Sequence, residues 1–277
     1  MATIVPQLTA LSTDPGNGAC LFFYNARNIF YPAGVGSSLG YTNYNGPLAF
    51  NSSTTTLRME ATSGNATVNG IRGAYVGVGL DVKGDFSTTS NGKTGSRVLG
   101  TQFNIISSCP ITGNSPNTIC VRMGDDEHYK IHTVTSNLTS YPLTTFPNNE
   151  KYTDTPPTTL HQYVSSVSDV TFKTVKVSLL NNGRVLRVDI KNNADGTFYP
   201  YLITQINSNG LRIGDPLYED PELLGVGLAF STSSSVTNCD VKNFSIHAIH
   251  HNLDRATDTV TPFAAPRFTA NYTHPSC

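Results

Sequence analysis

The stretch that decides the fold is Thr174–Lys191, which reads TVKVSLLNNGRVLRVDIK. In each half, aliphatic residues alternate with polar or charged ones, the two-residue period of a strand with one buried face. Asn181-Asn182-Gly183 separates the halves, and these residue types tolerate the positive φ angles of tight hairpin turns. The segment therefore predicts a β-hairpin with one apolar face.

Similar runs of β-branched, aromatic and glycine residues recur along the chain, whereas helical periodicity is nearly absent. Two long connections, residues 40–72 and 138–157, are predicted to be loops, and loops of this length are often functional. The sequence shows no internal repeat and no domain linker. Further strands are predicted at residues 20–24, 74–82, 97–106, 119–123, 128–134, 199–206, 223–231 and 240–249.

Composition narrows the classes of function. The 277 residues carry 18 basic and 19 acidic side chains without a Lys/Arg cluster, so we expect no nucleic-acid partner. No stretch approaches the roughly 18 apolar residues of a membrane helix, and we expect no membrane partner. The start of the sequence has no basic segment followed by an apolar run, so we expect synthesis in the cytoplasm without a signal peptide.

The five cysteines are widely spaced and contain no CxxC pair, which argues against zinc. Cys109 and Cys120 flank a turn-rich stretch and are able to face each other across a hairpin. Two interpretations stay open for them: a disulfide, or two small buried apolar side chains.

Three segments in order carry a family resemblance. They are GACLFF at Gly18–Phe23 with AGVGSSLGY at Ala33–Tyr41, YVGVGLDVKGDF at Tyr75–Phe86, and LGVGLAFSTS at Leu224–Ser233 leading to NFSI at Asn243–Ile246. Together they resemble the strands, glycine loop and metal loop of L-type lectins (legume-lectin-like, concanavalin-like), especially bacterial and phage-borne members.

The resemblance implies an all-β fold, a two-sheet antiparallel jelly-roll sandwich with glycan-binding loops at one end. Alternating strands joined by tight turns agree with two facing sheets. We expect an N-terminal arm at residues 1–14, the lectin-like domain at residues 15–250, and an extended C-terminal arm at residues 251–277. The proline-rich C-terminal arm either straps its own domain or docks on a neighbour.

The resemblance implies a glycan site formed by the glycine loop and a variable loop. The family's sugar-binding Asp is replaced by Ala19, whose methyl group accepts no hydrogen bond. Tyr41 either stacks on a sugar face or packs in the core, and both interpretations stay open. The predicted glycan-binding residues are Gly34, Gly36, Tyr41, Thr232 and Ser233.

The resemblance also implies a metal loop, with Asp81 and Asp85 as the candidate ligands. Gly79 stands where the family has a glutamate, and the family's later Asp position falls near Ser90. Calcium takes about six to eight oxygen ligands, so carbonyls and waters would have to supply the rest. The alternative is that Asp81 caps backbone amides in a tight loop.

No catalytic residues are predicted, and we expect a protein that is not an enzyme. Glycoside hydrolases of this architecture need two carboxylates about 5–10 Å apart on the concave face. No predicted strand shows the alternating acids that would supply them, and no GxSxG elbow is present. A hydrolase of the same fold remains the least favoured alternative.

The leading functional hypothesis is a lectin-like structural protein on the surface of a tailed-phage virion, as a decoration, fibre or tail component. Its terminal arms would contact other virion or self subunits, and its loops would contact surface glycans. The missing sugar-binding Asp and the low charge favour this hypothesis over the alternative, a soluble carbohydrate-binding lectin.

Overall fold

The computed structural model describes most of the strands and several of the loops between them. The described residues are 2–10, 16–28, 33–34, 36–50, 59–90, 93, 115–124, 128–135, 137–140, 160–163, 173–180, 185–191, 196–206, 224–231 and 237–246. Within them, helical structure is limited to short 3₁₀ stretches, which include η1 (Gly36–Ser38) and η3 (Leu138–Ser140). None of the helices in the described part is long and apolar enough to cross a membrane.

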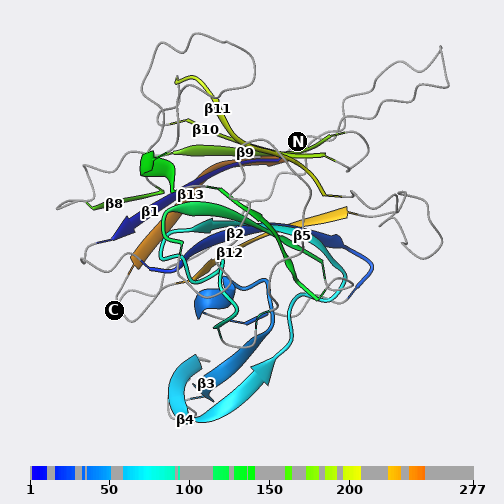
Figure 1. Cartoon of the computed structure of the whole chain (residues 1–277), viewed down its shortest axis with the longest axis vertical. Helices are drawn as coiled ribbons and strands as arrows, with labels where there is room; N and C mark the ends of the chain where they lie inside the picture. The colour runs from blue at the N-terminus through cyan, green and yellow to red at the C-terminus, as the bar shows by residue number, and fades with distance from the viewer. Residues whose placement is uncertain are drawn as a thin grey trace.

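The described strands form two main sheets and a small hairpin (Figure 1). Sheet A runs in the order β11 (Tyr199–Gln205), β10 (Val185–Lys191), β9 (Thr174–Leu180), β1 (Ala2–Ala10) and β13 (Thr237–Ile246), with β8 (His161–Tyr163) parallel to β1. Sheet B runs in the order β12 (Leu224–Ser231), β2 (Gly18–Asn25), β5 (Ala74–Asp81), β6 (Thr118–Met123) and β7 (Ile131–Val134). All other pairings within these sheets are antiparallel.

The two sheets enclose a mainly aliphatic core. Val76 and Val78 of sheet B belong to the same buried cluster as Val177 and Val188 of sheet A. Its other buried members are Leu21, Phe23, Leu80, Val82, Ile119, Val121, Met123, Leu138, Leu160, Val175, Leu186, Ile190, Tyr199, Tyr201, Leu202 and Ile206. The all-β, two-sheet prediction is therefore confirmed.

A hydrogen bond between the sheets shows which edge strand of sheet B lies over which edge strand of sheet A. His132 of β7 makes a 3.0 Å hydrogen bond with Thr204 of β11, so β7 lies over β11. Since β9 faces β2, β5 and β12 across the core, β12 at the other end of sheet B lies toward β13.

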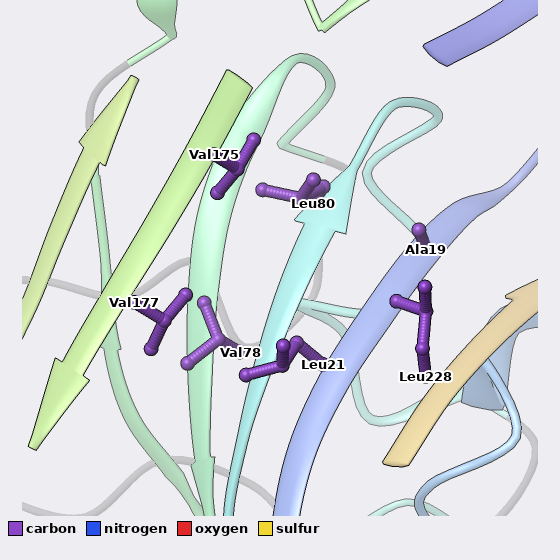
Figure 2. A pocket seen from close by; sticks show the side chains of 7 residues that line it. All are labelled: Ala19, Leu21, Val78, Leu80, Val175, Val177 and Leu228. Carbon is purple, nitrogen blue, oxygen red and sulfur yellow. The ribbon is translucent and has the colours of Figure 1, made fainter. Parts of the chain in front are cut away.

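A small apolar void remains between the sheets (Figure 2). It measures about 10 Å³, near the lower limit for one water molecule, and it offers no polar side chain to hold one. Its lining residues are Ala19, Leu21, Val78, Leu80, Val175, Val177 and Leu228.

The predicted hairpin is confirmed as β9 and β10, with Val177 opposite Val188 and Ser178 opposite Arg187. On its polar face, Asp189 is fully buried between two cations. Arg187 Nε lies 2.7 Å from Asp189 Oδ1, and Lys176 Nζ lies 3.3 Å from Asp189 Oδ2. Each oxygen of this buried carboxylate thus has a cation beside it, with a hydrogen bond from Arg187 to Oδ1 and none, among the described residues, to Oδ2.

Two segments differ from the prediction. Residues 2–10, expected in an N-terminal arm, form β1 between β9 and β13, with Ala2 opposite both Val177 and Ile246. The proline and the uneven polar spacing of this stretch obscure its strand character. In the connection expected to be a loop, β3 (Tyr44–Phe50) and β4 (Met59–Val68) form a hairpin beside the sandwich (Figure 1).

The outer face of sheet B carries a second buried cluster, which includes the rings of Phe22, Tyr41, Phe86 and Tyr129. Glycines alternate with inward-facing valines in β5, so that an added Cβ at Gly77 would overlap the ring of Tyr41 and one at Gly79 the ring of Phe86. In β12, Gly225 and Gly227 leave the same room for Tyr24 and Phe22. The VGVGL and LGVGL strings therefore supply apolar side chains to the inner face, and their glycines leave space for aromatic rings on the outer face.

Candidate functional site

The loop after β5 is organised by a buried carboxylate. Asp81 is 0% exposed, and its two oxygens each accept a 2.9 Å hydrogen bond, from the amides of Gly84 and Ser87. Gly84 has a φ of +88° and lies so close to the backbone at Ser115 that no side chain fits there. The geometry therefore agrees with the interpretation of Asp81 as a cap on backbone amides.

Burial shifts the pKa of Asp81. Loss of hydration raises the pKa of this carboxyl from 3.8 to about 7. The amides of Gly84, Phe86 and Ser87 act in the opposite direction, because they stabilise the charged form. Near neutral pH the side chain therefore sits close to its titration midpoint.

A buried guanidinium holds the same loop to the sheet. Arg122 of β6 is 0% exposed. Its Nε and Nη2 donate to the Phe86 carbonyl at 2.9 and 2.7 Å, and Nη2 also donates to the Thr88 carbonyl at 2.8 Å. Nη1 donates to the carbonyl of Tyr129 at 2.7 Å. One side chain therefore connects the loop after β5 with the turn between β6 and β7.

A buried ammonium links this loop to the glycine loop. Lys93 Nζ donates to Ser37 Oγ at 2.8 Å, to the Ser90 carbonyl at 2.7 Å and to Ser90 Oγ at 3.2 Å. Burial is the main reason why the pKa of Lys93 is lowered to about 8; Arg122 contributes in the same direction, whereas Asp85 and Asp81 act in the opposite one. Asp85 thus lies within electrostatic range of this lysine.

The predicted glycan-binding glycines lie in a tightly folded loop. The amide of Gly34 donates to the Thr42 carbonyl at 3.1 Å, so it is already used within the protein. Gly36 has a φ of +60°, and its Cα is half-buried at the start of η1. Gly40 packs so closely on Ala229 that a Cβ would overlap it. The loop is therefore seated on strand β12.

Tyr41, the predicted stacking residue, lies in the buried cluster on the outer face of sheet B and is 0% exposed. Its ring centroid is 5.8 Å from that of Phe22 and 5.7 Å from that of Tyr129, and its hydroxyl donates to the Met123 carbonyl at 2.9 Å. This environment agrees with the interpretation of Tyr41 as a residue that packs in the core. A sugar would reach the ring only if the loop moved.

The structure brings the predicted glycine loop and the predicted metal loop to the same end of the sandwich. Asn17 lies between them: its amide donates to the Ser231 carbonyl, and its own carbonyl accepts from Val82. The added Cβ position at Gly36 is 3.8 Å from Asn17 Nδ2. Thr232 and Ser233, which follow Ser231, lie outside the described residues, as do Cys109 and residues 251–277.

Four residues that hold these loops were not predicted: Asn17, Ser37, Lys93 and Arg122. For Arg122 the signal was present, because a lone arginine in the apolar string TICVRM (Thr118–Met123) indicates a buried cation with dedicated acceptors. Lys93 lies in a polar stretch where nothing distinguishes it from a solvated lysine. Among the described residues, no three His, Cys, Asp or Glu side chains are grouped as metal ligands would be.

Compared with models of known protein families, with curated proteins and with solved structures, the chain has no significant match. The lectin resemblance therefore depends on the three quoted segments.

Proposed function

We propose that this protein is a non-enzymatic, lectin-like structural protein that assembles with neighbouring subunits on the surface of a tailed-phage virion. The phage setting comes from the resemblance to phage-borne lectin-like proteins. Assembly is supported by one structural observation, the apolar side chains exposed along the open edge of the sandwich.

That edge is formed by β12 and β13, which end sheets B and A among the described strands. Leu224 is 44% exposed, Phe244 41% and Ile246 45%. Leu224 alternates with Gly225 and shares the inner face of β12, and Ile246 lies opposite Ala2 and thus on the face of Val177. Both edges therefore present apolar side chains at the rim of the core, where a partner would cover them.

Light scattering of the full chain tests this proposal. We expect an oligomer, and we expect Leu224→Ser combined with Phe244→Ser and Ile246→Ser to lower its mass. The matched control is Leu180→Ser with Ile203→Ser, because these residues are 44% and 39% exposed but lie on β9 and on β11, the strand at the opposite end of sheet A from β13. Deletion of residues 252–277 tests whether the expected C-terminal arm contributes to the oligomer. A wild-type chain that stays monomeric when concentrated would refute the proposal.

We also propose that the sandwich is a concanavalin-like jelly roll. In support, the chain passes repeatedly from one sheet to the other, with β1 in sheet A, β2 to β7 in sheet B apart from the β3–β4 hairpin, β8 to β11 in sheet A, and β12 and β13 divided between them. The pairing of the first strand with the last agrees with this arrangement.

A soluble carbohydrate-binding lectin is the second candidate. It is favoured by the 2.8 Å contact of Lys93 with Ser37, which joins the predicted glycine and metal loops at one end. A glycan array tests it, with Gly36→Val as the variant expected to abolish binding, because a φ of +60° strains a β-branched residue. Binding by the wild type that Gly36→Val leaves unchanged would place the sugar elsewhere.

A further inference from the structure

The loop that the lectin resemblance assigns to calcium uses many of its oxygen atoms for hydrogen bonds within the protein. Both carboxylate oxygens of Asp81 accept backbone amides within the loop. The carbonyls of Phe86, Thr88 and Ser90, the further oxygens that could complete a set of six to eight ligands, accept from Arg122 or Lys93. These five oxygens, two carboxylate and three carbonyl, are therefore already directed at protein donors.

We infer that Arg122 and Lys93 hold this loop end in place of a metal ion. Calcium would supply two positive charges and coordinate several oxygens, and the two side chains supply the same charge and bind carbonyl oxygens of the same loop. Arginine suits this role because its planar guanidinium directs several donors at once and keeps its charge when buried. A divalent ion placed beside two buried cations would be repelled.

The two cations attach the loop to different parts of the protein. Arg122 attaches the loop to β6 and, through the Tyr129 carbonyl, to the turn before β7. The Tyr129 hydroxyl donates to the Ile71 carbonyl at 2.9 Å, which adds the connection before β5. Lys93 attaches the loop to the glycine loop through Ser37. Segments distant in sequence are thus connected by protein side chains alone in these contacts.

The charges around the two cations are compatible with this arrangement. Asp81 and Asp85 both favour the charged form of Lys93, which offsets the repulsion from Arg122. Phe86 adds a further stabilising contact, because the guanidinium carbon of Arg122 lies 5.2 Å from the centroid of its ring. The inference holds whether or not the loops bind a glycan.

Thermal unfolding of the full chain in millimolar calcium chloride and in excess chelator provides the first test. A ligand that binds only the folded state raises the midpoint, so a calcium site of micromolar affinity would shift it by several degrees. We expect the two curves to coincide. A calcium-dependent rise in the midpoint would overturn the inference.

Amide hydrogen exchange provides the second test. In Lys93→Met, we expect the amides of residues 36–42 to exchange about tenfold faster or more, because the link to Ser37 is lost while the sheets remain folded. Lys130→Met is the matched control: it removes the same charge from a half-buried lysine near the β6–β7 turn and should leave these amides unchanged. Unchanged protection in Lys93→Met would show that this lysine does not hold the loop.

Discussion

The two faces of sheet B are shielded from solvent in different ways. The inner face is mainly aliphatic and packs against a second sheet, so most of its side chains need only suitable size and shape. The outer face is covered by the protein's own loops, and its cluster contains aromatic rings seated on glycines beside a buried arginine. Closing a sheet with loops brings backbone carbonyls into the interior, and these require buried donors. The buried charge is thus a consequence of the covering loops.

The largest expected effect is on the outer face. Arg122→Met removes the donor to three buried carbonyls, those of Phe86, Thr88 and Tyr129. We expect the free energy of unfolding to fall by about 3–5 kcal/mol, measured by urea denaturation.

Arg72→Met is the control for this variant, because Arg72 is exposed near the same face, and it should change stability by no more than about 0.5 kcal/mol. Equal effects of the two substitutions would mean that the carbonyls find other donors, and the difference between the two faces would disappear.

The pH dependence of stability comes next. The pKa of Asp81 rises from 3.8 in the unfolded chain to about 7 in the folded protein, so between these values the folded state binds the extra proton. Stability should therefore fall as the pH rises from about 4 to about 7, with a slope approaching 1.4 kcal/mol per pH unit. Unfolding by urea across this range measures it.

Asp81→Asn should flatten the slope over the same range, because asparagine does not titrate. Lys93, with a pKa of about 8, acts only above this window, so it does not disturb the comparison. A slope that persists in Asp81→Asn would assign the pH dependence to another group.

Gly77→Ala tests whether the glycines of β5 are needed to leave space for the aromatic rings. Its Cβ would lie 2.6 Å from Tyr41 Cε1, and we expect a loss of about 1–3 kcal/mol from overpacking. In a Tyr41→Leu background the loss should shrink, because leucine does not occupy the position of the ring. A double-mutant cycle measures this coupling, and strictly additive losses would contradict it.

The smallest effect is expected on the inner face. Val177→Ile places one more carbon in the void of about 10 Å³ between the sheets and should stabilise the protein by at most about 1 kcal/mol. Val188→Ile is the control, because Val188 is fully buried and does not line the void, so it should be neutral or destabilising. Thermal unfolding of both variants decides the comparison.

The sequence predicted the inner face better than the outer one. Alternation located the β9–β10 hairpin, and the VGVGL string located β5, because a two-residue period reports directly which side chains are buried. The outer face depends on contacts between segments far apart in the chain, such as Arg122 with Phe86 or Lys93 with Ser37. No local pattern records such a contact, and the sequence accordingly allows two interpretations of Tyr41, whereas the structure shows it buried.

The position of β1 determines the order in which sheet A can be completed. Among the described strands, β1 pairs only with β8, β9 and β13, and the earliest of these begins at His161. During translation, β1 must therefore wait for more than half of the chain before any partner emerges from the ribosome. Such distant pairings slow folding and leave an unpaired strand available to other nascent chains. Refolding from denaturant should accordingly be slow, and it should become less efficient as the protein concentration rises.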